Sequence, residues 1–297
     1  MSLEDFLSLL LSGLTVGAIY GMTGVSLSIA YKPTNVFNMA QGGFVMLGMM
    51  FGWGLLTFFK MPWWLGTILV MACVALIGVI VERVAVAPVQ RENQHSHGWI
   101  ISTLAISIIM VNVADKIWGS DPRQVPPIPG TSMQQREFGA FGFTTNQIAV
   151  ILVAFISVAA IEYFYHRTRT GRAVLAVAED RDGARLCGIS PLRMTMGSFA
   201  VGAAYAAFTG IIAAPFLLAS THVGLEMLIK GFIALAIGGL GSHWGTLLGG
   251  ILIACIESFG SGYLSPGIRQ LLLLTVFLSI LFVRPYGFFG QAVGREV

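Results

Sequence analysis

The stretch PWWLGTILVMACVALIGVIV, residues 62–81, contains twenty residues and no charged side chain. A helix needs about 20 mainly apolar residues to cross the hydrocarbon core of a bilayer, so this stretch predicts a transmembrane helix. The rest of the chain has the same character, because 56% of its 297 residues are hydrophobic and 10% are charged. Its mean hydropathy is +0.80, and a soluble domain carries about 25% charged residues. We therefore interpret the chain as an all-α polytopic membrane protein.

Eight apolar runs of this kind divide the chain. They cover residues 6–31, 34–59, 62–81, 99–114, 146–165, 194–219, 227–256 and 268–283. The run 227–256 is interrupted by four glycines, so it is either one long tilted helix or two short helices that meet at the glycines. The sequence thus predicts a single transmembrane domain over residues 1–297 with eight or nine helices. The start of the chain lacks the basic region of a signal peptide, and we expect the first helix to be retained.

The connection between two of these runs, residues 166–193, fixes the predicted orientation. It holds six arginines, at positions 167, 169, 172, 181, 185 and 193. Loops rich in basic residues stay in the cytoplasm, so we place this loop inside. Counting crossings from there puts the N-terminus and the proline-rich loop 115–145 outside. Arg284 and Arg295 favour a cytoplasmic C-terminus, which requires nine crossings.

The loop 166–193 is predicted to fold as a short helix in water. With its three acids it carries nine charges, which would cost on the order of 25 kcal/mol inside a membrane. Residues 172–181, RAVLAVAEDR, are strong helix formers, and Gly188 and Pro191 are placed to end a helix. Small residues among charges suit docking into a protein groove. An amphipathic helix lying on the lipid surface is the alternative.

Two stretches of the chain resemble each other. VGAIYG, residues 16–21, is similar to VGAAYA, residues 201–206. In the predicted topology the two copies run in opposite directions, which indicates an inverted repeat; chance similarity between helices rich in small residues is the alternative. Small residues also recur every four positions in several runs, a pattern that lets membrane helices approach closely.

The sequence offers no energy source or catalytic site of its own. No Asp, Glu, Lys or Arg lies deep in a predicted span, which argues against a proton-coupled carrier. No Gly-Lys dipeptide occurs, so no Walker A loop is present. His95 and His97 lack further clustered ligands and indicate a solvated loop. Glu226 and Lys230 stand four residues apart and predict an ion pair at a solvated helix end.

Three stretches resemble a known family. AVAEDRDGARLCGI (176–189), with the small-residue helix that follows, is similar to the cytoplasmic loop of permease subunits of bacterial ABC importers, in particular the branched-chain amino acid (LivH-type) permeases. NVFNMAQGGFVMLGMM (35–50) resembles that family's second-helix signature, although Met39 is inserted and Gln41 stands where His is common. AIGGLGSHWGTLLGG (236–250) and VRPYGFFG (283–290) resemble its last two signatures.

The resemblance implies a transport subunit that is not an enzyme and binds no cofactor itself. Such a permease pairs with a second, related permease subunit in the bacterial cytoplasmic (inner) membrane. Two cytoplasmic ATPase subunits bind ATP below it, and a periplasmic substrate-binding protein delivers the substrate from outside. No nucleic acid takes part. The loop 166–193 then holds the coupling helix, which transmits ATP-driven closure of the ATPases.

Two groups of residues are candidates for this function. The residues that match the family's loop pattern are the predicted contacts with the ATPases: Glu179, Asp180, Ala184, Leu186 and Gly188. Asn35, Asn38 and Gln41 are uncharged polar residues at the start of a span. They either line the translocation pathway or bond the free backbone groups of a broken helix.

The expected cargo is a branched-chain or other aliphatic amino acid. The first alternative is urea or a short amide, because related urea permeases share these motifs. A self-sufficient channel or secondary carrier is an alternative of a different class, and solute flux through the isolated chain distinguishes it.

Overall fold

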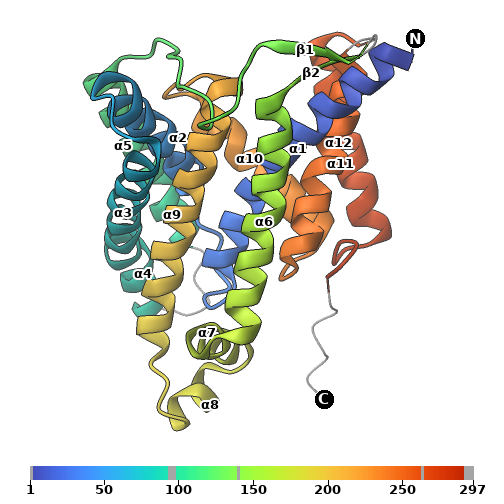
Figure 1. Cartoon of the computed structure of the whole chain (residues 1–297). Helices are drawn as coiled ribbons and strands as arrows, with labels where there is room; N and C mark the ends of the chain where they lie inside the picture. The colour runs from blue at the N-terminus through green and yellow to red at the C-terminus, as the bar shows by residue number, and fades with distance from the viewer. Residues whose placement is uncertain (1–2, 93–97, 139–140, 262–263, 291–297) are drawn as a thin grey trace. The chain divides into compact units, whose positions relative to one another are not determined.

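The computed structural model describes residues 3–92, 98–138, 141–261 and 264–290. The chain forms two compact units, each described here by itself. The first unit contains residues 1–25, 127–159 and 230–297, and the second contains residues 26–126 and 160–229. Helices α1, α6 and α10 are each divided, with one part in the first unit and the other part in the second (Figure 1).

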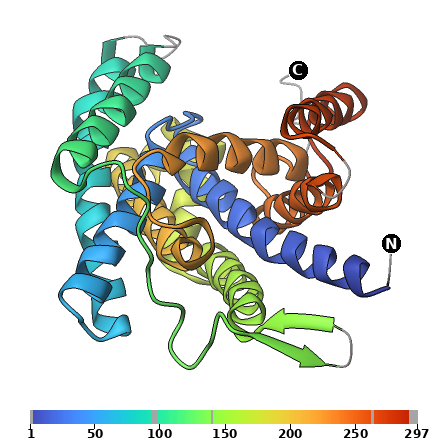
Figure 2. The same cartoon turned by 90° about the horizontal axis from the view of Figure 1, so that it is seen from above.

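The described residues are mostly helical. The helices are α1 (Leu3–Tyr31), α2 (Gln41–Gly52), the π-helical turn η1 (Trp53–Phe58), α3 (Trp63–Val81), the π-helical turn η2 (Glu82–Val86), α4 (Ala87–Glu92), α5 (Gly98–Trp118), α6 (Thr145–Arg167), α7 (Arg169–Glu179), α8 (Arg181–Leu186), α9 (Pro191–Leu217), α10 (Val223–Gly238), α11 (His243–Ser261) and α12 (Pro266–Val283). Strands β1 (Gln135–Phe138) and β2 (Phe141–Thr144) form an antiparallel hairpin that leads into α6 (Figure 2).

Seven of these helices, within the described ranges, are long and apolar enough to cross a membrane. They are built on α1, α2 with η1, α3 with its π-helical extension, α5, α6, α9 and α11. Helix α10, with 16 residues, and the apolar part of α12 are shorter. The all-α polytopic membrane fold expected from the sequence is therefore confirmed at this level.

The apolar run 227–256 forms two helices, as one of the two predicted alternatives required. Helix α10 ends at Gly238 and α11 begins at His243. Gly239 and Gly241 in the connection have φ angles of +102° and +97°, a backbone region that residues with a Cβ rarely adopt. The glycines therefore mark a tight turn between antiparallel neighbours.

Two predicted segments differ from the structure. The run 34–59 was predicted to form a span, and its first helix, α2, begins only at Gln41. Helix α1 ends at Tyr31, the chain turns over the next residues, and Asn35 adopts a left-handed φ of 53°. The loop 115–145 was expected to be irregular, yet it ends in the β1–β2 hairpin; its strands of four residues are too short to stand out in a polar segment.

Small residues bring helices together in the first unit. An added Cβ at Gly13, Gly17 or Gly21 of α1 would lie 2.5–2.9 Å from a backbone Cα atom of α11. Real side chains do not tolerate such distances, so these glycines permit direct contact between the two backbones. The predicted role of the small-residue pattern in helix packing is confirmed here.

The second unit is built around α9. An added Cβ at Gly48 of α2 would lie 2.2 Å from the Ala207 carbonyl oxygen, and one at Gly78 of α3 would lie 2.5 Å from the Ala203 Cβ. Helices α2 and α3 therefore pack on α9 through small residues. This places one end of α9 beside α7 and α8, where the predicted functional loop lies (Figure 1).

Candidate functional site

The loop 166–193 folds into two short helices rather than one. Thr168 caps the first, α7, because its Oγ1 accepts a hydrogen bond from the Gly171 backbone N–H at 3.0 Å. The buried residues of α7 are Gly171, Val174 and Val177, which share one face. Charged residues occupy its outer face, so α7 is amphipathic.

Asp180 makes the junction between α7 and α8. Its backbone is extended, with φ −148° and ψ 112°, and its Oδ1 accepts a hydrogen bond from the Asp182 backbone N–H at 2.9 Å. A carboxylate at this position accepts a hydrogen bond from a free backbone N–H, and its negative charge interacts favourably with the positive N-terminal end of the helix dipole. Asp180 therefore has a structural task in shaping the loop.

Helix α8 ends where the sequence predicted. Gly188 has a φ of +77°, its N–H donates to the Arg185 carbonyl at 2.9 Å, and the Ile189 N–H donates to the Ala184 carbonyl at 3.0 Å. This is the glycine-terminated arrangement typical of helix C-termini. No heavy atom of the described residues lies within 4 Å of an added Cβ at Gly188, so the backbone here is open to a partner.

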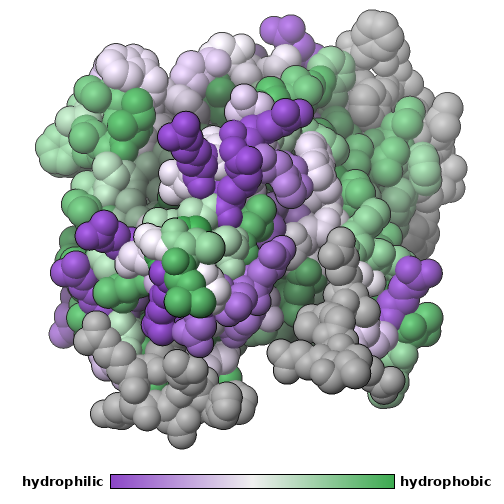
Figure 3. Space-filling view, turned by 90° about the horizontal axis from the view of Figure 1, so that it is seen from below, coloured by the Kyte–Doolittle hydropathy of each residue, from purple (hydrophilic) through white to green (hydrophobic). Residues whose placement is uncertain are grey.

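The five predicted contact residues do not all face outward. Leu186 is 91% exposed, and Glu179, Asp180 and Gly188 are exposed as well. Ala184 is 5% exposed, so its side chain supports α8 from the inner side, and its role as a contact residue stays a prediction. Seen from below, hydrophilic side chains surround a small hydrophobic group around α7 and α8 (Figure 3).

Polar contacts join α8 to its surroundings. The Arg181 guanidinium donates to Thr195 Oγ1 of α9 at 3.4 Å, and Arg185 pairs with Asp182 at 3.0 Å on the surface. Burial lowers the pKa of Arg181, nearby Arg185 lowers it further, and Asp182 raises it. Arginine stays charged under all such shifts, so α8 is tied to α9 by a permanent cation.

The three candidate pathway residues are only partly brought together. The Asn38 Nδ2 donates to Gln41 Oε1 at 3.2 Å, and both side chains are buried. Asn38 Oδ1 accepts from the Ala40 backbone N–H at 3.0 Å, and Gln41 Nε2 donates to the Gly202 carbonyl of α9 at 2.8 Å. Asn35 is exposed and stands apart. The hydrogen bonds of Asn38 and Gln41 thus go to each other and to backbone groups.

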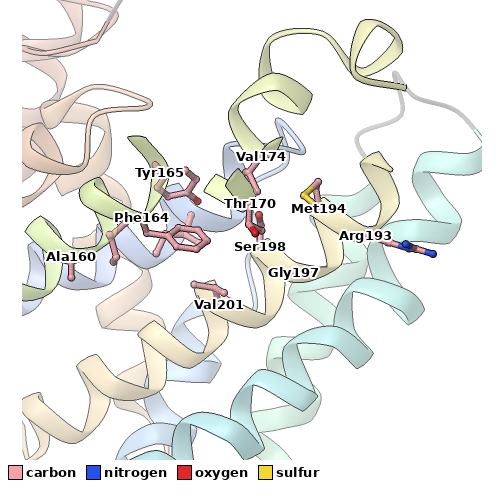
Figure 4. A pocket seen from close by; sticks show the side chains of 12 residues that line it. Ala160, Phe164, Tyr165, Thr170, Val174, Arg193, Met194, Gly197, Ser198 and Val201 are labelled. Atoms are coloured by element: carbon pink, nitrogen blue, oxygen red, sulfur yellow. The ribbon is translucent and has the colours of Figure 1, made fainter. Parts of the chain in front are cut away.

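A pocket of about 390 Å³ lies beside α7. Its walls come from α6, α7, α9 and Ile29 near the end of α1, all within the second unit (Figure 4). Its lining is predominantly apolar. Since Thr170 and Val174 of α7 form part of the wall, the pocket adjoins the candidate coupling segment.

A buried charged cluster in the first unit was missed. Lys230 Nζ lies 2.7 Å from both carboxylate oxygens of Glu257, Tyr20 donates to Glu257 at 3.2 Å, and Arg269 Nε lies 3.8 Å from it. The predicted pair of Glu226 and Lys230 was wrong, because Lys230 is 8% exposed and Glu226 faces outward.

The packing of α10 on α11 brings these charges together, and the sequence alone does not show that packing. An added Cβ at Gly249 would lie 2.4 Å from the Ala234 carbonyl, so α10 and α11 form a close antiparallel hairpin. Continuing the four-residue spacing from Ala234 leads to Lys230, and continuing it from Gly249 leads past Ile253 to Glu257. Lys230 thus lies about one helical turn and Glu257 about two turns beyond this contact, both on the side away from the glycine turn, and the long lysine side chain spans the difference.

Metal ligands do not gather in the part of the chain that the structure describes, where no three His, Cys, Asp or Glu side chains form a group able to hold an ion. His95 and His97 lie outside the described residues.

The chain is similar in sequence to permeases of branched-chain amino acid transport systems. A family model described as the permease component of branched-chain amino acid transport systems matches residues 9–281. High-affinity branched-chain amino acid transport system permease proteins are similar over 98% of both chains: LivH of Salmonella typhimurium at 29% identity, LivH of Escherichia coli K12 at 28% and BraD of Pseudomonas aeruginosa at 27%.

Among solved structures, PsaBC from Streptococcus pneumoniae in complex with Fab has a similar fold, with a TM-score of 0.51. The alignment covers 95% of this chain and 92% of that chain at 14% identity, and it speaks to the fold alone. With the family model covering almost the whole sequence, the chain belongs to the permease components of branched-chain amino acid transport systems.

Proposed function

We infer that this chain is the membrane-spanning permease subunit of an ATP-driven ABC importer for branched-chain or other aliphatic amino acids. The relatives over 98% of its length are permeases of branched-chain amino acid transport systems, which supports the cargo. Seven described helices can span a membrane, and we place the chain in the bacterial cytoplasmic (inner) membrane, as the family resemblance implies. The chain itself performs no catalysis.

The observation that carries this proposal is the α7–α8 segment, with Leu186 standing 91% exposed among charged side chains. An exposed leucine within a polar rim is typical of a protein contact in which an apolar anchor enters a pocket. We assign this contact to two cytoplasmic ATPase subunits that bind ATP. Glu179, Asp180 and the open backbone at Gly188 complete the surface.

Force applied to Leu186 has a direct route into the membrane helices. Asp180 and Gly188 fix both ends of α8, and Arg181 ties it to Thr195 on α9. At the other end of α9, the Ala219 and Arg123 backbones exchange hydrogen bonds of 2.8 and 2.9 Å. Movement of α8 is therefore transmitted along α9 to the loop that follows α5.

The remaining parts of the importer follow from this assignment. The segment α7–α8 lies in the cytoplasm, and the loop 115–145 and the N-terminus lie outside, where a periplasmic binding protein delivers substrate. Shorter α10 and α12 also cross, giving nine spans with an inverted repeat. A second, related permease subunit completes the pathway, and Asn38 and Gln41 act by bonding backbone groups at the start of α2.

Reconstitution tests the proposal. Proteoliposomes that contain the chain with its neighbouring ATPase, permease and binding-protein gene products should take up labelled leucine only when ATP is present. The Leu186→Ser variant should lose uptake and ATPase attachment, whereas Leu225→Ser, which changes an exposed leucine on α10, should keep both. Leucine flux through the chain alone would contradict the proposal, and preferential uptake of urea would overturn the cargo.

A further inference from the structure

The apolar pocket beside α7 is unsuited to an amino acid. Its walls include Ile29, Phe164, Val174, Met194 and Val201, and few polar atoms face it. Burying the charged groups of an amino acid without partners would be strongly unfavourable. A hydrocarbon chain has no such groups and gains from contact with these side chains. The lining therefore selects an apolar occupant.

The pocket opens along one face of α9. Arg193, Gly197 and Val201 are spaced by four residues and line it, and all three are exposed. Apart from the adjoining residues of the helix itself, no described heavy atom lies within 4 Å of an added Cβ at Gly197, so the helix backbone itself forms an open floor. Arg193 thus places a cation in the first turn of α9, and the apolar groove continues past Gly197, one turn further, to Val201, two turns further.

Arginines occur in or next to the segments that line this groove. Arg193 extends outward from the pocket (Figure 4), and Arg167, Arg169 and Arg172 lie in or beside the first turn of α7. Within the described ranges, none of these four arginines forms an ion pair with a carboxylate. Nearby Glu162 contacts His166 at 3.0 Å. The segments that form the groove therefore carry excess positive charge.

We propose that this pocket binds an anionic phospholipid, with an acyl chain in the groove between α6 and α9 and the phosphate beside Arg193 and the arginines of α7. Arg193 lies at one end of an apolar groove, and an anionic phospholipid likewise has a charged headgroup at one end of an apolar acyl chain. Because Val174 of α7 forms part of the wall, the bound lipid contacts the segment proposed to meet the ATPases. This binding site does not depend on the identity of the cargo.

Lipid binding by the purified full-length chain tests the proposal. Delipidated protein is titrated with phosphatidylglycerol or phosphatidylcholine, and bound lipid is counted by native mass spectrometry. We expect one phosphatidylglycerol to bind more tightly than phosphatidylcholine. The Gly197→Leu variant fills the groove and should abolish this binding, while leucine is a better helix former than glycine. Gly267→Leu in α12 is the matched control, because its Cβ also meets open space.

The headgroup contact is tested separately with Arg193→Gln, which leaves the apolar walls intact. This variant should bind phosphatidylglycerol about fivefold more weakly, the contribution of one basic residue near an anionic lipid surface, and phosphatidylcholine as before. Equal affinity for the two lipids, or unchanged phosphatidylglycerol binding by Gly197→Leu, would overturn the proposal. Crosslinking of a Gly197→Cys variant to a second permease subunit in membranes would do the same, since a protein would then cover the groove.

Discussion

The α7–α8 segment and the Lys230–Glu257 cluster both concentrate charge, but in opposite environments. Asp182 and Arg185 of α8 pair in the open, with side chains 86% and 64% exposed. The Lys230 and Glu257 side chains are 11% and 16% exposed and belong to helices with apolar neighbours. Exposed charges cost little and remain available to a partner, whereas a buried charge has to be paired. The α7–α8 segment is thus suited to contact with a partner protein, and the Lys230–Glu257 cluster is suited to fixing the position of α10 against α11.

The largest effect should come from breaking the buried pair. Glu257→Gln leaves Lys230 without its carboxylate, and we expect the free energy of unfolding to fall by about 3–5 kcal/mol. Thermal melting and denaturant titration of the purified protein measure it. The double variant Lys230→Met/Glu257→Met should recover most of the loss, and exposed Glu226→Gln should change little. Equal losses in the single and double variants would show that the pair itself is not responsible.

A smaller effect is expected at the end of α8. Gly188→Val forces a β-branched residue into a φ of +77°, which costs about 1–2 kcal/mol. The loss should be local, so the protein still inserts and folds, but amino acid uptake should be abolished because α8 no longer presents Leu186 correctly. Gly267→Leu is the control with normal helical geometry. Full uptake by Gly188→Val with normal ATPase attachment would argue against the proposed role.

Removing the cap between α7 and α8 should have a similar or slightly smaller effect. Asp180→Ala deletes the acceptor for the Asp182 N–H, and the loss of such a cap costs about 1 kcal/mol. Hydrogen exchange at the first turn of α8 should become faster while exchange in α9 stays unchanged. Asp180→Asn, which keeps the acceptor oxygen, should behave like the wild type; faster exchange in both variants would point to the charge instead of the cap.

The smallest effect is expected for the exposed pair on α8. Arg185→Gln removes the contact with Asp182, and exposed pairs contribute about 0.2–1 kcal/mol. The melting temperature should stay within about 2 °C of the wild type. A loss as large as that of Glu257→Gln would remove the distinction between the two regions.

The sequence was sufficient to predict most helices, because twenty uncharged residues such as 62–81 have few alternatives to a membrane helix. It also predicted the end of α8 at Gly188 and the two-helix alternative for 227–256. It did not predict the inward position of Ala184, since a small residue is equally compatible with a contact surface and with close packing. The sequence also did not decide between pathway lining and backbone bonding for Asn38 and Gln41. The structure shows that they bond each other and backbone groups.

The sequence by itself determined where the chain is apolar and where it is charged, because the cost of placing charge in hydrocarbon acts on each segment independently. Only the tertiary structure decided which charges meet. Lys230 and Glu257 are 27 residues apart and become neighbours only because α10 and α11 turn back on each other at the glycines. Likewise, the apolar pocket beside α7 exists only where α6 and α9 come together. Such contacts depend on helix packing, and local sequence patterns do not encode it.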